Sequence, residues 1–309
     1  MAFVLVAAAC GGGSEDAAST DSTVEETTET TETPEPEPET TTTTAPPEPI
    51  LAIDVERLPA LGTDGYEAWL IGAEGQTESL GTFDVDGTGA VELVRPAEPA
   101  FEPTEVRITI ETDDDPAPSD TVVLAGAIVG DQAELALFGL PSFADANGQY
   151  ILATPTDGDG PGENERGGVW WTFIPRSQSL VVPELPESWI YEHWYVIDGQ
   201  PVAGGTFRVP FGQPDDAAPY SGPDEGPPVV GEDFLVNAPD GLTFPVDLRG
   251  MELFITVEPF PDTGPEPFTI EPLRGTIPDD AIDHTHYAVE NTADNVPSGT
   301  ATLTERPAG

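Results

Sequence analysis

One phrase occurs twice in this chain, and it constrains the fold more than any other feature. Residues 66–83 read YEAWLIGAEGQTESLGTF, and residues 191–207 read YEHWYVIDGQPVAGGTF. Both copies contain Tyr-Glu-x-Trp, then Gly-Gln, then Gly-Thr-Phe. Chance recurrence is improbable because the whole chain holds only 5 Trp. The phrase therefore predicts a duplicated structural unit.

The correspondence extends beyond the phrase, because three more short motifs recur in the same order. These motifs are Leu-Pro (58–59 and 185–186), Ile-Thr-Ile/Val-Glu (108–111 and 255–258) and Leu-x-Gly-x-Ile (124–128 and 273–277). The offset between the copies is 124 residues at Gly-Thr-Phe and 147 at Ile-Thr. The second copy therefore carries an insertion of about 23 residues, within the Pro- and Gly-rich stretch at about 210–245.

Period-two alternation of apolar and polar side chains predicts strands in both units. Val106, Ile108 and Ile110 alternate with polar residues, and Leu253, Ile255 and Val257 show the same spacing. Such alternation is typical of strands with one buried face. The 35 Pro and 32 Gly disfavour long helices.

We therefore predict an all-β fold with two tandem β-sandwich domains of immunoglobulin-like type. The first repeat spans residues 50–156, and the second spans 169–309 and includes the insertion. The two are joined near 157–168.

The N-terminal sequence predicts attachment to a membrane through a lipid. MAFVLVAAAC followed by GGGS resembles a bacterial lipoprotein signal, so residues 1–10 are expected to be a signal remnant with a lipobox. Cys10, the only Cys in the chain, would carry the lipid on the outer face of a bacterial membrane. The alternative is an incidental Cys in a short apolar N-terminus. Residues 1–9 lack the basic residues of a signal peptide, so we expect an in-frame start codon upstream.

Residues 11–49 are rich in Thr, Glu and Pro and predict a disordered acidic stalk, because they offer little apolar surface to offset the ordering entropy. Over the whole chain, 58 acidic residues face 9 basic ones, and the net charge of −49 excludes nucleic acid as a partner.

The ordered motifs resemble a known family. Leu-Pro-x-Leu, Tyr-Glu-x-Trp-Leu-Ile, Gly-Thr-Phe, Ile-Thr-Ile-Glu and Val-Val-Leu-Ala-Gly over residues 50–129 are similar to the C-terminal extracytoplasmic domain of anti-sigma-K factors. The second copy resembles it more loosely over 180–277. The resemblance implies a β fold outside the membrane and no catalytic residues. The zinc-associated His-x(3)-Cys-x(2)-Cys motif of the family's sigma-binding domain does not occur in this sequence.

Several polar residues form candidate metal sites. His284 and His286 would point to one face of a strand, as metal ligands can. Asp157, Asp159 and Glu163 form an oxygen-rich Gly loop that could hold calcium. The alternatives are a solvated strand face and a solvated acidic linker.

Aromatic side chains form candidate ligand-stacking sites. Trp69 and Trp194 occupy equivalent places in the two copies, where core packing is the main alternative. Trp170 and Trp171 would point to opposite faces of a strand, so that one of them would be exposed for stacking on a sugar or partner.

The sequence thus predicts a non-catalytic, lipid-anchored envelope sensor or protein-interaction module with no cofactor other than calcium. Its partner would be an envelope protein or a cell-wall glycan. Two other functions stay open at this point: a carbohydrate or cell-wall binding module, and a metal-dependent hydrolase around His284 and His286.

Overall fold

The computed structural model describes residues 49–305 except 63, 87, 112–115, 159–164, 174–176, 212–215 and 262–263. The described residues form strands, turns and loops with no helix among them, so none of them lies in a helix able to cross a membrane. The strands pair antiparallel. The predicted all-β fold is confirmed. The predicted signal remnant and Cys10 lie outside the described residues, as does the stalk except for Pro49.

An eight-stranded sheet contains the first copy of the phrase, in the order β3-β2-β5-β6-β7-β20-β1-β4. Its strands are β1 (Pro49–Glu56), β2 (Gly65–Gly72), β3 (Thr77–Phe83), β4 (Val91–Pro96), β5 (Pro103–Glu111), β6 (Val122–Val129), β7 (Gln132–Leu137) and β20 (Ser298–Glu305). The first and last strands of the described chain therefore belong to one sheet.

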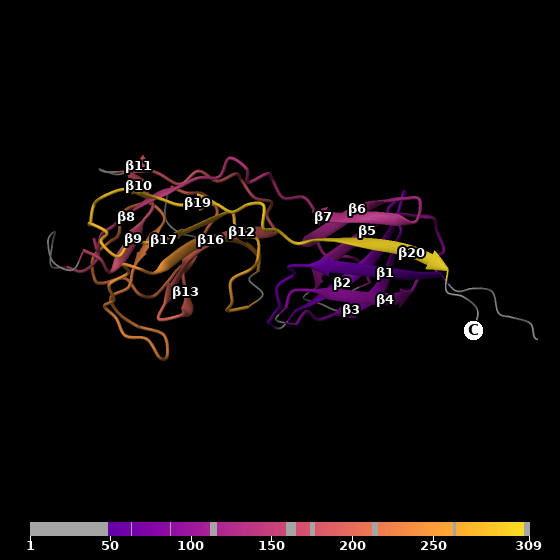
Figure 1. The fold of residues 1–309 in the computed structure, drawn as a ribbon, viewed down its shortest axis with the longest axis horizontal. Helices are drawn as coiled ribbons and strands as arrows, with labels where there is room; N and C mark the ends of the chain where they lie inside the picture. The colour runs from indigo at the N-terminus through magenta and orange to yellow at the C-terminus, as the bar shows by residue number, and fades with distance from the viewer. Residues whose placement is uncertain are drawn as a thin grey trace, which may run out of the picture. The chain divides into compact units, whose positions relative to one another are not determined.

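The last strand occupies an interior position in this sheet. β20 pairs with β1 along its whole length, from Pro49 opposite Glu305 to Glu56 opposite Ser298, and it pairs with β7 on its other side. Figure 1 shows β20, in yellow, alongside β1, in indigo. The repeat pattern predicts residues 298–305 as part of the second repeat, whereas the hydrogen bonds place them in the first sheet. Repeated motifs carry no information on such long-range pairing.

The second copy of the phrase lies in a six-stranded sheet, in the order β14-β13-β12-β16-β17-β19. Its strands are β12 (Trp189–Ile197), β13 (Gln200–Phe207), β14 (Asp216–Ala217), β16 (Glu252–Pro259), β17 (Leu273–Thr276) and β19 (Glu290–Asn291).

A smaller, four-stranded sheet has the order β15-β9-β8-β18. It consists of β8 (Gln149–Leu152), β9 (Gly168–Trp170), β15 (Gly231–Asp233) and β18 (Tyr287–Ala288), and a separate short pair is formed by β10 (Thr172–Phe173) and β11 (Ser177–Gln178). β8 falls within the predicted first repeat, 50–156, yet it pairs with β9 and β18.

The two copies of the phrase occupy the same place in the two larger sheets. The order β3-β2-β5-β6 in the first corresponds to β13-β12-β16-β17 in the second. The register also shifts at the same point of the phrase, between Glu67 and Trp69 and again between Glu192 and Trp194. The motif matches made from the sequence thus fall on equivalent strands.

An indole–hydroxyl bond ties the two central strands together in each copy. Trp69 Nε1 donates to Thr109 Oγ1 at 2.9 Å, and Trp194 Nε1 donates to Thr256 Oγ1 at 2.9 Å. Both tryptophans are buried, so each indole N–H needs this acceptor. The alternative given for Trp69 and Trp194, core packing, is what the structure shows.

Each Thr hydroxyl in turn donates a hydrogen bond to the carboxylate of a Glu near the end of its strand. Thr109 Oγ1 donates to Glu111 Oε1, and Thr256 Oγ1 donates to Glu258 Oε1. The same carboxylate oxygens accept a backbone N–H from the following loop, at 3.0 Å from Ser119 N and 2.9 Å from Phe268 N. The repeated Ile-Thr-x-Glu motif is therefore a hydrogen-bonded chain that fixes the loop after the strand.

The tyrosine of the phrase anchors the chain that leads into it. Tyr66 OH donates to Pro59 O at 3.0 Å, and Tyr191 OH donates to Pro183 O at 2.7 Å. Each ring also stacks on the Phe of Gly-Thr-Phe, with centroids 5.6 Å apart in the first copy and 5.3 Å in the second.

The predicted apolar face is buried in both copies, whereas the polar face is partly buried in the first copy, where Thr109 is buried, and almost wholly buried in the second. In β5, Val106, Ile108 and Ile110 are buried, as predicted. In β16, both faces are buried, because Phe254 stacks on Trp194 and Thr256 lies under the same indole. An apolar residue on the second face, Phe254, is the sequence signal of this double burial.

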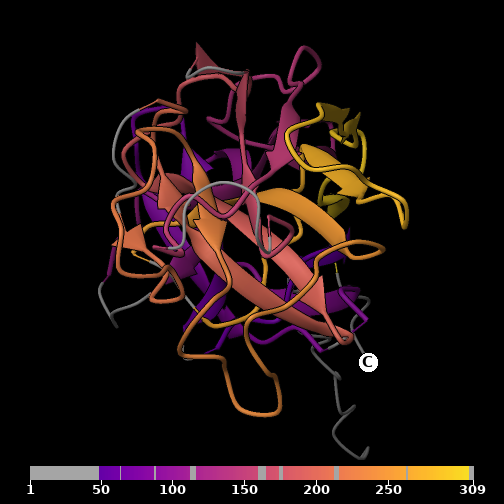
Figure 2. The same ribbon diagram turned by 90° about the vertical axis from the view of Figure 1, so that its left-hand side faces the viewer.

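The insertion at 210–245 runs mostly as loops, drawn in orange between β13 and β16 in Figure 2. It contains β14 and β15, and β15 pairs with β9 in the small sheet. The insertion thus supplies an edge strand that has no counterpart in the first copy.

Replacing Thr109 or Thr256 by Val should lower the free energy of unfolding by about 1–3 kcal/mol, because Val keeps the shape and leaves the indole N–H unsatisfied. Urea unfolding followed by circular dichroism measures the change. Thr300→Val, on the exposed side of β20, is the matched control and should change stability by less than about 0.5 kcal/mol. Equal effects at Thr109 and Thr300 would contradict the role given to the indole bond.

Candidate functional site

The most unusual polar group of the described chain lies on β15, where two carboxyl groups interrupt an apolar run. Residues 229–236 read VVGEDFLV, with Glu232 and Asp233 at its centre. Both are buried, at 3% and 0% exposed. Because neighbouring residues of a strand face opposite sides, the two carboxyl groups enter different surroundings.

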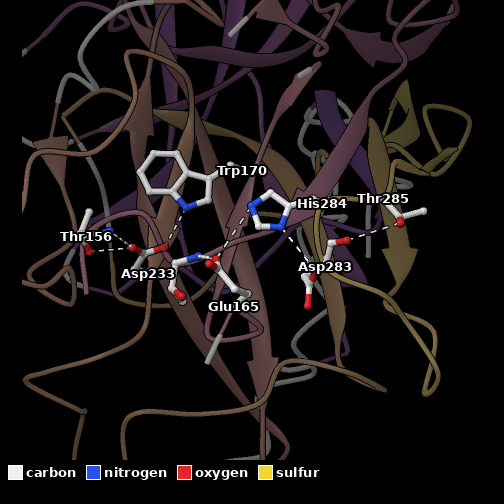
Figure 3. A network of polar contacts seen from close by, with 8 residues as sticks. Thr156, Glu165, Trp170, Asp233, Asp283, His284 and Thr285 are labelled. Carbon is white, nitrogen blue, oxygen red and sulfur yellow. Dashed lines mark hydrogen bonds and ion pairs between the residues drawn. The ribbon is translucent and has the colours of Figure 1, made fainter. Parts of the chain in front are cut away.

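Asp233 is held by three donors from two other segments. Trp170 Nε1 donates to its Oδ1 at 2.7 Å, and Oδ2 accepts from Thr156 N at 2.8 Å and from Thr156 Oγ1 at 2.6 Å. Figure 3 shows the carboxylate between the indole and the threonine. Asp233 therefore connects β15, β9 and the loop after β8.

Glu232 points to the other side of β15, into the main core. Its Oε1 accepts from Ser221 Oγ at 2.7 Å, and Tyr195 of β12 lies close enough for the carboxylate charge to raise the pKa of the Tyr195 phenol, adding to the larger effect of burial. The phenol of Tyr195 lies 3.0 Å from His193 Nδ1. Burial lowers the pKa of His193 to about 3, so this imidazole is neutral at ordinary pH.

Burial raises the pKa of both acids. It raises the pKa of Glu232 to about 8, against the bond from Ser221 and with a further rise from the charge of Asp233. It raises the pKa of Asp233 to about 6, against the bonds from Thr156 and Trp170. The pKa values of both groups are higher in the folded protein than in the unfolded chain. Their contribution to the free energy of unfolding is therefore largest below about pH 4 and is lost as the pH rises to about 8.

A third buried carboxylate, Glu165, lies beside one of the predicted metal-site residues, His284. Glu165 Oε2 accepts from Thr154 N at 3.1 Å and lies 3.9 Å from His284 Nε2. His284 Nδ1 lies 3.4 Å from Asp283 Oδ1 (Figure 3). This second group of contacts reaches the surface at His284, whose side chain is 45% exposed.

The predicted placement of His284 and His286 on one strand face is wrong. His284 lies in a turn with a φ of 54°, where its N–H donates to Leu152 O at 2.9 Å. His286 is exposed and packs edge-on against Phe173, with centroids 5.4 Å apart. Among the described residues no group of three or more His, Cys, Asp or Glu is arranged to hold a metal ion.

The predicted calcium loop is only partly covered by the structure. Asp159 and Glu163 lie outside the described residues. Asp157 is described, and its charge contributes to the raised pKa of Asp233. Calcium at this loop therefore stays a prediction.

The predicted exposure of one of the two neighbouring tryptophans is wrong. Trp170 is 4% exposed and Trp171 is fully buried. The ring of Trp170 lies over Gly226 and Gly231, whereas Trp171 packs edge-on against Tyr150 at 5.8 Å between centroids. Each face of the strand is covered by its own cluster, so neither ring offers a surface for stacking on a sugar.

Asp233 can approach β9 closely because residue 168 is a glycine, which has no side chain in the way. A Cβ at Gly168 would lie 2.0 Å from Asp233 Oδ1 and 2.4 Å from Ala153 O. Gly222, which donates its N–H to Thr156 Oγ1 at 2.8 Å, is under the same constraint, since its Cβ would lie 2.2 Å from Thr156 O.

A separate surface groove lies where β12 begins and β13 ends. It has a volume of about 570 Å³ and is lined by Glu184, Leu185, Glu187, Arg208, Val209 and Phe260. The Arg208 guanidinium lies 4.6 Å from the Phe260 ring centre and donates to Trp189 O at 2.9 Å. Val209 and Phe260 are exposed, at 58% and 48%.

Sequence reasoning missed Glu232 and Asp233 because they are two of 58 acidic residues. The available signal was their position between Val-Val and Phe-Leu-Val, since charged residues inside an apolar run of strand length imply burial. It singled out Trp170 and His284 for unrelated reasons, and the structure places Trp170 beside Asp233 and His284 beside a different buried acid, Glu165.

Comparison with known proteins gives one match. The family model described as "Anti-sigma-K factor rskA, C-terminal" matches residues 1–122, which is less than half of the chain. The match ends at the first residue of β6 and includes β1 to β5 of the eight-stranded sheet. No curated protein and no solved structure matches the chain. The predicted resemblance to the outer domain of anti-sigma-K factors is thereby confirmed for the first copy.

Gly168→Ala should lower the free energy of unfolding by about 1–3 kcal/mol or more, because the added methyl group meets Asp233 and a backbone carbonyl. Gly65→Ala is the matched control, since nothing lies within 4 Å of the Cβ position there. Thermal and urea unfolding of both variants test the difference. A Gly168→Ala protein as stable as Gly65→Ala would mean that Asp233 is not held as described.

Proposed function

We propose that this chain is a lipid-anchored, non-catalytic interaction module of the bacterial cell envelope, related to the outer domain of anti-sigma-K factors. The family match over residues 1–122 carries the proposal, because it includes the predicted lipobox and strands β1 to β5 of the first sheet. The matching family is an anti-sigma factor domain, which supports a role in interaction rather than catalysis.

The N-terminal sequence supports the anchor. Small and apolar residues precede Cys10, and a Gly/Ser spacer follows it, as in lipoprotein signals. Two acyl chains on one Cys would hold the protein at a membrane surface stably, since one chain alone binds only marginally. The acidic Thr/Pro/Glu stretch at 11–49 would then separate the folded part from the lipid.

The second copy supports duplication of the family's domain. It repeats the four-strand order, the register shift and the Trp–Thr–Glu bonds of the first copy. We propose that the duplicated unit gained its own role through the insertion and through the groove around Arg208. At the position of Arg208 the first copy has Asp84, so the two copies present opposite charges there.

The groove favours a protein partner over a glycan. Val209 and Phe260 expose apolar surface around a guanidinium, and such a combination is typical of the centre of protein interfaces. The residues predicted to stack on a cell-wall glycan, the other predicted partner, are Trp170 and Trp171, and both are buried.

Cys10→Ser should abolish lipid attachment. The chain, expressed from its native locus, should incorporate radiolabelled palmitate and sediment with membranes, and the variant should do neither. Circular dichroism of the two proteins checks that the fold is unaffected. Membrane sedimentation of the variant equal to that of the wild type would rule out an anchor at Cys10.

Phe260→Ser should weaken partner capture at least tenfold, because it removes the apolar face on which Arg208 lies. The anchored protein is crosslinked in native membranes in high and low salt, and the captured species are quantified. Val129→Ser, which removes an apolar side chain that is 79% exposed in the first sheet, is the matched control. The groove is not the interface if capture is lost equally in both variants or in neither.

A further inference from the structure

The first sheet is made from two separate parts of the chain, and the second copy of the repeated phrase lies between them in sequence. Strands β1 to β7 precede that copy, and β20 follows it. Residues 138–297, here called the nested segment, therefore leave the first sheet at the end of β7 and return to it at the start of β20. A force that acts on the nested segment is passed to the first sheet through these two strand ends.

The two strand ends that hold the nested segment lie side by side. β7 and β20 pair antiparallel with Leu135 opposite Gly299, so the last residues of β7 lie beside the first residues of β20. Asn291 also holds the two connecting segments together, because its Nδ2 donates to Phe143 O and to Ala146 O, each at 2.8 Å. The nested segment is thus attached to the first sheet at one end of the strands.

The N-terminal part of the chain enters the first sheet at the other end of the strands. β1 begins at Pro49, which lies opposite Glu305 at the end of β20. It ends at Glu56, opposite Ser298, the residue at which β20 begins. A pull between residue 49 and the nested segment therefore draws β1 and β20 in opposite directions along their own axes. In this shear geometry all β1–β20 pairs carry the load together, since the hydrogen bonds of an antiparallel ladder are perpendicular to the strands.

β1 is held on both sides, so sliding it out of the sheet breaks two ladders at once. Its other edge pairs with β4. A backbone bond from Ala97 N to Pro49 O, at 2.9 Å, closes this second ladder where the chain enters the sheet. The side chains of Leu51, Ile53 and Val55 are buried, so sliding also takes an apolar face out of the core.

A pull between the two ends of the described chain acts on the same ladder in a different way. Pro49 and Glu305 lie opposite each other at one end of the β1–β20 ladder. Pulling these two residues apart loads one pair at a time, because each pair breaks before the next one is strained. The ladder therefore resists a load on the nested segment far better than a load on residue 305.

Gly299 allows β20 to lie close to β1 at the end where the nested segment is attached. It pairs with Val55, and a Cβ at residue 299 would lie 2.4 Å from both Asp54 O and Val55 Cγ1. A side chain at this position would move β20 away from β1. The close contact of the two strands at their loaded end therefore depends on a glycine.

We propose that the first sheet is a load-bearing clamp, in which β1 and β20 stay paired while the nested segment is pulled away from the N-terminus. The inference rests on the proposed function for the source of the load alone: lipid at Cys10 would hold one end, and a partner bound to the nested segment would pull on the other. The clamp itself follows from the strand register. It is therefore measured on the unlipidated chain, where failure of the clamp and failure of the anchor are separate results.

Single-molecule force spectroscopy of the full, unlipidated chain tests the clamp. One handle is attached to Cys10, the only natural Cys, and the other to Asp294→Cys, in an exposed turn of the nested segment, or to Gly309→Cys, after β20. At one loading rate, the unfolding force through Asp294→Cys should be at least about twofold higher than through Gly309→Cys, because only the first geometry shears the ladder. Equal forces, or a higher force through Gly309→Cys, overturn the proposal.

The length released in the first unfolding event shows which part of the chain carried the load. Through Asp294→Cys, loss of the first sheet should lengthen the chain by about 300 Å, the extended span of residues 49–137. A first event of about 500 Å, the extended span of residues 138–294, means that the nested segment unfolded instead and contradicts the proposal.

Two glycine variants separate the β1–β20 ladder from overall stability. Gly299→Ala crowds β1 and should lower the force measured through Asp294→Cys. Gly126→Ala is the matched control, because its Cβ would lie 2.2 Å from Glu134 O of β7 and so causes similar crowding outside the β1–β20 ladder. It should change the force much less. An equal loss of force in both variants contradicts the clamp. If Gly299→Ala does not fold, the comparison of the two handle positions in the otherwise unchanged chain decides the question.

Discussion

The bond from a buried indole N–H to a threonine hydroxyl joins β2 to β5 and β12 to β16, the pairs at the centre of each copy. The hydroxyl accepts this bond and also donates its O–H to a glutamate carboxylate, and that glutamate then fixes the following loop. A large aromatic ring with one polar atom is thereby buried with its polar atom satisfied. The four strands of each copy are arranged around this chain of donors and acceptors.

The second copy departs from this plan by adding polar groups to its core. The first copy satisfies its buried acids with nearby hydroxyl and backbone donors, as Ser79 does for Glu67. In the second copy, the insertion brings Glu232 and Asp233 into the interior, where hydroxyl, indole and backbone donors bind them and no cation lies among the groups described around them. Such acids lower stability at high pH.

Local sequence patterns predicted many of the strands, but they did not predict which strands far apart in the sequence pair with each other. The alternation at Val106, Ile108 and Ile110 indicated a half-buried strand, and the repeated phrase identified equivalent strands of two sheets. Residues 298–305 gave no hint of joining the first sheet, because a short Thr-rich strand can pair with many edges. Burial of Trp170 and Trp171 likewise depends on the distant segments that cover each face. The turn at His284 depends on a bond to Leu152, which no local pattern shows.

The interior place of β20 has a consequence for the order in which this chain acquires its structure. Until residue 305 has been synthesised, the edges of β1 and β7 have no strand between them. Every residue of the second copy precedes β20, so the part made first is completed last. An unpaired edge attracts other strands, and the early segment is therefore open to such pairing during synthesis. Ribosomal pausing or a premature stop near the 3′ end would harm the N-terminal sheet more than the second copy.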